Sequence, residues 1–538
     1  MREPRRILIT GATDGIGLAL ARIYKEQGER PFLLGRQSWS ALSHLAAEFA
    51  EADYCRADLA EPDAVMCVIQ FLQERELDRL DVVVHNAGVG YYGRFAAQSP
   101  ESINRLITVN LAAPMALTHA LLPWLPAGKG QVAFIGSVAA DLPGPEYAVY
   151  TATKAALAGF TRSLQVEWQG QVTVQLIQPG ATRSGMHQKM GVSPAVMGWE
   201  QFPPAEKTAS GIVKAIEGKR PFVTIGAGNQ LAVLAGRQLG FVVDPVVRKK
   251  QLKVDSGQLT VGSERFTETL TNHASRLTED APTCVITGAA DGIGRALALR
   301  FGQAGYRICG VDVDALRAAD TVAELAELGV EAAFVVADLG SAAGMATAVS
   351  QLLSGPPIDV LIHNAGINAV GPFADLPLAR QMQVIDVNLR APLWLTAVLE
   401  ANQMLSTDGS LVFLSSLSKF VGYPGAAVYA ATKDGLAAYA RSLRVALGPA
   451  RTVLTVYPGP TRTEHARRYS PDNGREERRL PPEELAAGIF QAVQNRQAQF
   501  IPGAGNQTFA ALGKLFPGLM NRAMKKTIYD PLRGRTLT

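Results

Sequence analysis

Residues 7–17 read ILITGATDGIG, a short apolar run that stops at a glycine-rich turn and leads into a segment of helical period. Glycine lets the backbone bend sharply and approach a pyrophosphate closely, and the N-terminus of the helix that follows favours an anion. The glycine spacing is GxxxGxG. One such motif also has a plain structural reading, because any tight strand-to-helix bend favours glycine. The segment predicts a strand, a turn and a helix. The turn either binds a pyrophosphate or is only a tight bend in the backbone.

The same segment occurs twice in the chain. VITGAADGIG begins at Val285, and DVVVHNAGV from Asp81 matches DVLIHNAGI from Asp359. Further matches are VNLAAP with VNLRAP, VYTATKAALAGFTRSL with VYAATKDGLAAYARSL, PGATRS with PGPTRT, and two copies of GAGNQ. The spacing between matches hardly changes along the chain, so each copy is expected to fold as a full domain.

The two copies define the expected domains and fold class. Residues 251–280 are rich in Ser, Thr and Glu, and we interpret them as a linker between a first domain, residues 1–250, and a second, residues 281–538. In each copy, short apolar runs alternate with longer segments of helical period. That alternation predicts an α/β fold with a doubly wound parallel sheet, and ligands beyond the carboxyl ends of its strands.

Composition narrows the class of protein. The 538 residues are 47% hydrophobic and 19% charged, which is typical of a globular chain. A net charge of +4 without a long basic tract argues against nucleic acid. The four cysteines show no metal-ligand spacing, so no metal site is predicted, and a cytoplasmic location is favoured. No apolar segment reaches the roughly 20 residues of a membrane helix, and no signal-peptide core precedes Thr10.

Each copy also carries a Tyr-x-x-x-Lys pair at the start of a predicted helix, where both side chains share one face. A serine at the end of a strand lies 13 residues before each tyrosine, and an asparagine lies inside each VNL segment. A lone pair of this kind is often an ordinary surface neighbourhood, but four matched residues occur in the same order twice. The candidate catalytic residues are Asn110, Ser137, Tyr150, Lys154, Asn388, Ser416, Tyr429 and Lys433.

The order TGxxxGIG, NAG, Asn, Ser and YxxxK resembles the short-chain dehydrogenase/reductase family over essentially the whole of both halves. The resemblance implies two tandem Rossmann-type domains that bind NAD or NADP and move a hydride to or from a carbonyl or alcohol carbon. It makes the tyrosine a general acid or base, with its pKa lowered by the neighbouring ammonium and the nicotinamide ring. Serine would hydrogen-bond the substrate oxygen, lysine the nicotinamide ribose, and asparagine would support a proton-relaying water. His85 and His363 replace the first Asn of the usual NNAG, and we interpret both as structural.

The resemblance and the glycine turns together assign cofactor-binding residues in five segments of each copy. In the first copy these are Gly11, Asp14, Gly15, Ile16, Gly17, Arg36, Asp58, Leu59, Asn86, Gly88, Pro179, Gly180 and Thr182. In the second copy they are Gly288, Asp291, Gly292, Ile293, Gly294, Asp312, Asp338, Leu339, Asn364, Gly366, Pro458, Gly459 and Thr461.

The copies differ where the second strand ends. An acid there accepts from both adenosine-ribose hydroxyls but repels a 2′-phosphate. The second copy has Asp312, with Asp314 nearby, whereas the first has Gly35 followed by Arg36, a donor suited to phosphate. We predict NADP in the first domain and NAD in the second. The alternative is that Arg36 is a solvated loop charge.

The substrate is a small alcohol or ketone by the same resemblance. The expected lids, residues 185–204 and 464–482, share little sequence, so the two sites need not accept identical substrates. In the first lid the apolar side chains that hint at a hydrophobic substrate are Met186, Met190, Met197, Trp199 and Phe202.

Two features bear on partners. An apolar stripe follows each YxxxK pair; it either packs on its own sheet or joins the halves into an intramolecular pseudo-dimer, with a further homodimer left open. The segments after Gln230 and Thr508 are apolar with basic ends. A membrane-surface contact is one reading of them, and closing the substrate pocket or packing at an interface is the reading we favour.

Three functions fit these residues. One half oxidises an alcohol while the other reduces the ketone, which would invert a hydroxyl centre on a lipophilic substrate. Alternatively, two independent ketone reductases share one chain. The third reading is a non-catalytic dinucleotide-sensing or scaffold protein, which would be expected to lack one of the four catalytic residues; neither copy does.

Overall fold

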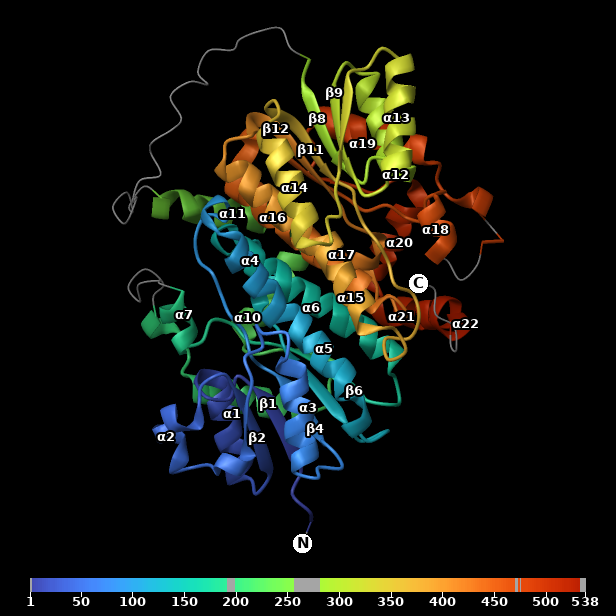
Figure 1. The fold of residues 1–538 in the computed structure, drawn as a ribbon. Coiled ribbons are helices and arrows are strands. Elements are labelled where there is room, and N and C mark those ends of the chain that lie inside the picture. Colours follow the sequence, from blue (N-terminus) through green and yellow to red (C-terminus); the bar gives the residue numbers. More distant parts are fainter. Residues whose placement is uncertain (1, 191–198, 256–280, 470–472, 475, 533–538) are drawn as a thin grey trace.

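The computed structural model describes residues 2–190, 199–255, 281–469, 473–474 and 476–532. Within them each copy forms a seven-stranded, all-parallel sheet with helices on both faces (Figure 1). The strand orders are β3-β2-β1-β4-β5-β6-β7 and β10-β9-β8-β11-β12-β13-β14. The predicted doubly wound α/β class is confirmed in both copies. The order reverses between β1 and β4, and between β8 and β11, so the loops after these strands diverge and leave room for a ligand.

The elements of the first copy follow the predicted alternation. Its strands are β1 Arg6–Thr10, β2 Arg30–Gly35, β3 Tyr54–Arg56, β4 Val82–His85, β5 Gln131–Ile135, β6 Thr173–Gln178 and β7 Phe222–Thr224. Its helices are α1 Gly15–Glu26, α2 Ser43–Ala46, α3 Ala64–Glu74, α4 Pro100–Ile107, α5 Ala113–Ala120, α6 Ala148–Glu167, α7 Gly185–Lys189, α9 Ala205–Glu217, α10 Ala227–Gln238 and α11 Gly240–Asp255.

The second copy repeats the pattern. Its strands are β8 Thr283–Thr287, β9 Arg307–Asp312, β10 Ala332–Val336, β11 Ile358–His363, β12 Leu405–Leu414, β13 Thr452–Val456 and β14 Gln499–Phe500. Its helices are α12 Gly292–Gly302, α13 Ala315–Glu327, α14 Ala342–Leu353, α15 Leu378–Ile385, α16 Ala391–Ala401, α17 Ala427–Leu447, α18 Glu464–Tyr469, α19 Pro482–Gln494, α20 Ala504–Leu515, α21 Pro517–Met524 and α22 Asp530–Leu532.

Strand β1 shows why these runs form a central strand. Successive side chains of a strand point to opposite faces. Ile7 and Ile9 are buried in the core under α1 and α9, whereas Leu8 is buried in the core on the other face. A strand buried on both sides reads as a continuous apolar run, as it does here.

Helices α6 and α17, one from each half, lie side by side at the centre of the molecule (Figure 1). Phe160 of α6 contacts Phe134 of its own sheet, with ring centroids 5.7 Å apart. It also contacts Phe373 of the second half at 5.1 Å, and Trp168 lies 5.9 Å from the same ring. The apolar stripe of α6 therefore packs both on its own sheet and across to the other half.

The contact between the halves is not symmetric in sequence. Asp434 of α17 is buried against Gly159 of α6 and pairs with Arg162. A Cβ atom added at residue 159 would lie 2.5 Å from the Asp434 carboxylate. At the related place on the other side, Ala155 and Ala438 pack together in a small apolar cluster.

The ends of both copies also reach this interface. Arg441 of α17 forms an ion pair with Asp244 of α11, with 2.6 Å between nitrogen and oxygen, and the Lys525 ammonium donates to the Gln169 side chain of the first half at 3.3 Å. Helix α11 continues to Asp255, past residue 250 where the linker was predicted to start; residues 256–280 of that linker lie outside the described residues. No helix in the described ranges is both long and apolar enough to cross a membrane.

Candidate functional site

The glycine turn after β1 has the shape expected of an anion-binding turn. Gly11 and Gly15 have φ values of +65° and +54°, in the left-handed region that favours glycine. A Cβ atom at Gly17 would lie 2.1 Å from the carbonyl oxygen of Gly11. In the second copy a Cβ at Gly294 would lie 1.8 Å from the equivalent oxygen. Only glycine fits these places, and the open backbone fits a dinucleotide pyrophosphate at the helix N-terminus.

Asn86 ties the end of β4 to this turn across the point where the strand order reverses. Its side-chain amide donates to the carbonyl oxygens of Thr10 at 3.0 Å and Gly11 at 3.2 Å. Asn364 makes the same two contacts in the second copy, at 3.0 and 2.9 Å. His85, the departure from the usual motif, is buried and stacked on Phe134, and burial lowers its pKa to about 3.

The four catalytic candidates of the first copy meet beyond the carboxyl ends of β4 and β5. Asn110 lies in a π-helical turn, Thr108–Ala112, and both accepts from and donates to the backbone of Val89, at 2.8 and 2.9 Å. The Lys154 ammonium donates to the Ile135 carbonyl at 3.0 Å. The Ser137 hydroxyl hydrogen-bonds Tyr150.

The second copy reproduces this arrangement. Asn388 exchanges hydrogen bonds of 2.8 and 2.9 Å with the Ile367 backbone, Lys433 donates to the Leu414 carbonyl at 2.9 Å, and Ser416 hydrogen-bonds Tyr429. The structure therefore brings all eight predicted residues into two matching clusters.

Burial is the largest influence on the pKa of the tyrosine and the lysine in each cluster. Burial raises the pKa of Tyr150 and raises that of Tyr429 to about 12, while each serine hydroxyl acts in the opposite direction. Burial lowers the pKa of Lys154 and of Lys433 to about 8. Each lysine donates to a backbone carbonyl, and Lys154 Nζ lies 5.8 Å from the Tyr150 ring centroid.

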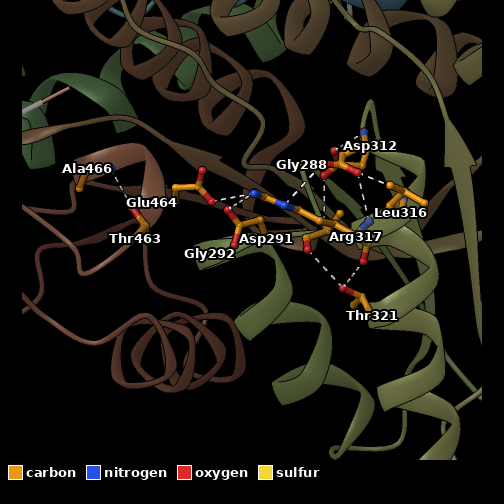
Figure 2. A network of polar contacts seen from close by, with 12 residues as sticks. Gly288, Asp291, Gly292, Asp312, Leu316, Arg317, Thr321, Thr463, Glu464 and Ala466 are labelled. Atoms are coloured by element: carbon orange, nitrogen blue, oxygen red, sulfur yellow. Dashed lines mark hydrogen bonds and ion pairs between the residues drawn. The ribbon is translucent and has the colours of Figure 1, made fainter. Parts of the chain in front are cut away.

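The ends of the second strands differ as predicted, and the turns facing them differ too. Asp312 accepts from the N–H of Ala290 at 2.8 Å and lies beside the glycine turn (Figure 2). In the first copy, a Cβ atom at Gly35 would lie 2.5 Å from the Thr13 side chain, so an acid has no room there. The Arg36 side chain that follows is exposed.

Arg317 of α13 is a residue that the sequence did not single out. Its guanidinium pairs with Asp291 of the glycine turn at 2.9 Å and with Glu464 of α18 at 2.7 Å (Figure 2). In the first copy, Lys189 of α7 pairs directly with Asp14 at 3.0 Å. In both copies, a charged contact therefore ties the first helix of the lid to the turn where the cofactor is expected.

The Pro-Gly segments after β6 and β13 close the site from the opposite side. A Cβ at Gly15 would lie 3.0 Å from Ser184, so this segment packs on the glycine turn. Gly180 is covered by Asn229, and Gly459 by Asn506, each the Asn of a GAGNQ repeat. The sequence repeat carried this signal, although neither asparagine was predicted as a site residue.

The remaining predicted residues lie on the rim of the same region. Asp58 follows β3 and accepts from the Ala60 N–H at 3.0 Å, and Asp338 accepts from the Gly340 N–H at 2.8 Å. Leu59 and Leu339 are buried. The other members stand in the glycine turns, the NAG segments and the Pro-Gly segments: Ile16, Gly88, Pro179, Thr182, Gly288, Gly292, Ile293, Gly366, Pro458 and Thr461. Of the first lid, Met197 lies outside the described residues.

Glu167 of the first half reaches loops of the second half that flank Tyr429. It is buried, and its two carboxylate oxygens accept from the N–H of Phe373 and from the N–H of Gly425, the latter at 3.1 Å. Alanine stands at the equivalent position of the second copy, residue 446. The second half therefore offers no matching carboxylate to the first site.

Glu167 should make the stability of the chain depend on pH. Burial raises its folded-state pKa to about 7, above the ordinary value of 4.5, although both N–H groups lower it. Its protonated form is favoured in the folded state, so the free energy of unfolding should fall as pH rises from about 4.5 to 7, by about 3 kcal/mol. Thermal unfolding of Glu167→Gln between pH 5 and 8 should lack most of this slope.

The matched control is Gln165→Ala on the same helix, since within the described part of the chain Gln165 bonds only to backbone of the first half. It should keep the slope. An unchanged slope in Glu167→Gln would show that other groups cause it.

The known proteins named here each match less than half of this chain. The family model described as short chain dehydrogenase matches residues 5–193 and again 282–474. Nodulation protein G of Rhizobium sp. (strain N33) is 30% identical over 246 residues, 45% of this chain and 94% of that protein. The 1-deoxy-11-beta-hydroxypentalenate dehydrogenase of Streptomyces avermitilis is 35% identical over 235 residues, 42% of this chain and 86% of that protein. A short-chain dehydrogenase from Sphingobium yanoikuyae, solved in complex with NADPH, is 30% identical, covers 44% of this chain and 95% of its own, and has a TM-score of 0.40.

Proposed function

Because the chain belongs to the short chain dehydrogenase family, as an NAD(P)-dependent oxidoreductase with two copies of the family's fold, we propose that both halves interconvert an alcohol and a ketone. The observation that carries the proposal is the repeated cluster of Asn, Ser, Tyr and Lys beside a glycine turn. A scaffold or sensing protein would have no need to keep both clusters complete.

The proposed chemistry assigns each residue a separate task. When bound, NAD(P) supplies or accepts the hydride. Tyr150 and Tyr429 give a proton to the substrate oxygen during reduction and take it during oxidation. The paired serine hydroxyls hydrogen-bond the same oxygen and stabilise charge that develops there. Lys154 and Lys433, held by backbone carbonyls, place a positive charge beside each tyrosine, and the asparagines fix the loop after β4 or β11.

We propose NADP for the first half and NAD for the second. The support is local: Gly35 leaves no room for an acid, and Arg36 is exposed for a phosphate. In the second half the Asp312 carboxylate stands beside the glycine turn, and a carboxylate at the end of this strand would accept from ribose hydroxyls and repel a 2′-phosphate.

Different cofactors in one chain favour a coupled reaction over two independent reductases. We propose that one half oxidises an alcohol and the other reduces the ketone, with inversion of the hydroxyl centre of a lipophilic substrate. The halves would act as an intramolecular pseudo-dimer, for which the packing of α6 on α17 is the support. Two independent ketone reductases remain the second candidate.

The coupled reaction has a direct test. A panel of single-enantiomer secondary alcohols is incubated with the full chain and with NAD and NADPH each in at least equimolar amount to the alcohol, because one inversion consumes one of each, and products are resolved by chiral chromatography. Inversion that requires both cofactors is expected. Ketone release at each half without inversion would support two independent reductases, and no turnover with any alcohol or ketone would contradict both.

A further inference from the structure

The two clusters sit among different side chains. In the second half, Tyr469 of α18 is buried in a small apolar cluster with Val370, Ala426 and Leu532, and Tyr429 packs against it. The first lid helix therefore contributes a hydroxyl-bearing side chain within the neighbourhood of the proposed acid. The position that matches Tyr469 in the first copy is Met190.

Arg380 of α15 reaches into this neighbourhood. Its guanidinium donates to the Tyr469 hydroxyl at 2.7 Å, to the Asn368 carbonyl at 3.2 Å and to the Gln383 side chain at 2.6 Å. All three acceptors are uncharged, and no carboxylate lies at ion-pair distance from Arg380 among the described residues. Its Nε–H is buried and has no acceptor there. One hydrogen-bond donor of the Arg380 guanidinium therefore lacks an acceptor among the described residues.

His465 lies near Arg380 and Tyr469, and its pKa responds to the positive charges around it. Its ring centroid lies 4.8 Å from that of Tyr469 on the same helix. Burial lowers its pKa to about 4, and the charges that lower it further are those of Lys433, Arg380 and Arg468. Arg380 and the ammonium of the second cluster therefore act on one side chain, which makes the region between them electropositive.

The first half has none of these groups at the matched positions. Ser102 replaces Arg380, Met186 replaces His465 and Gly90 replaces Asn368. A Cβ atom at Gly90 would lie 2.2 Å from the sulfur of Met190, so the thioether lies directly over the loop after NAG. At these matched positions the first half carries no charged side chain, whereas the second half carries a guanidinium and an imidazole.

We propose that the second site takes a substrate that carries a carboxylate, an oxo acid or hydroxy acid, which Arg380 binds, whereas the first site, with Ser102 at the matched position, selects for the apolar body of its substrate. This rests on the proposed function of the two clusters. A carboxylate is the planar anion that a guanidinium binds best, and it supplies the missing acceptor. A half-buried cation without a counter-charge is costly, so an incoming anion is favoured. A single substrate for both sites would need an apolar body and a carboxylate.

The test uses the full chain with Tyr150→Phe, which leaves only the second cluster complete. Oxo acids of six to twelve carbons and their methyl esters are compared as NADH-dependent substrates. We expect the acid of each pair to have the higher kcat/KM. Arg380→Ser, which introduces the residue of the first half, should lower kcat/KM for the acid by about 10- to 150-fold, mainly through KM, and leave the ester nearly unchanged. Arg380→Lys should restore part of the preference.

Two results would overturn the proposal. One is a preference for the ester, and the other is an equal loss for acid and ester in Arg380→Ser, which indicates that Arg380 only fastens α18. If neither the oxo acids nor their methyl esters are turned over, the proposed function fails. The binding of a carboxylate by Arg380 is then tested separately, without turnover. Decanoate, but not decanamide, should then raise the melting temperature of the NADH-loaded chain and not that of Arg380→Ser; an equal response of both proteins contradicts it.

Discussion

Replacing Tyr429 by Phe is expected to lower NAD-dependent turnover by about 10²- to 10⁴-fold, because the change removes the proton that the substrate oxygen must receive. The ring remains and fills the same space, so the apolar cluster around it should persist. Tyr150→Phe should have the same effect on NADP-dependent turnover. The measurement is steady-state oxidation of NADH and of NADPH by each full-length variant with a panel of ketones.

Each variant serves as the control for the other. Tyr429→Phe should leave the NADPH-dependent rate within a few-fold of the parent, and Tyr150→Phe should do so for NADH. Melting temperatures of all forms should agree, because only a hydroxyl group is removed. If the double variant keeps full turnover, the assignment of the two tyrosines as acids is wrong.

The second large effect is expected at the ends of β2 and β9. Arg36→Ala should weaken NADPH binding to the first half by about 10- to 150-fold, since a charge-assisted contact to phosphate contributes about 1.5–3 kcal/mol. Asp312→Asn should weaken NADH binding to the second half by a similar factor and ease the binding of NADPH there. Calorimetric titration of each cofactor into the full chain measures both effects.

Asparagine is chosen at residue 312 so that an effect on NADH binding can be told apart from an effect on the stability of the fold. An amide oxygen still accepts from the Ala290 N–H, so the glycine turn keeps its support and only the charge is lost. Arg36 is exposed, and its removal should not change the melting temperature. Unchanged affinities for both cofactors in Arg36→Ala would mean that Arg36 is a solvated charge.

Local sequence was enough for the fold and for both clusters, because these depend on patterns within short segments. The glycine turn lies between β1 and α1 as expected. Tyr150 lies in the first turn of α6, four residues before Lys154 on the same helix. Strands β3, β7 and β14, of three, three and two residues, were not predicted individually, since so few residues show no periodicity. The extension of α11 across residue 250 was hidden in a stretch of mixed composition.

Residues that act across long separations could not be predicted. Glu167 bonds to Phe373, 206 positions away, and Arg317 bonds to Glu464, 147 positions away. Nothing near either residue in the sequence marks its partner. The surroundings of the two lysines are a related case: helical spacing places each lysine near its tyrosine, but only the structure shows that its ammonium donates to a backbone carbonyl.

The contact between α6 and α17 is asymmetric, because Asp434 faces Gly159 whereas Ala155 faces Ala438. This asymmetry is possible because the two copies are parts of one chain. In a symmetric dimer every substitution appears twice and must suit its own image. Two second halves paired in this way would set Asp434 against Ala438, where it now meets Gly159, and the extra methyl group has no room beside the carboxylate. Covalent fusion lifts that restriction, because each surface can then change without its image changing too. The α17 surface of the second copy therefore fits the α6 surface of the first copy and does not fit a second copy of itself.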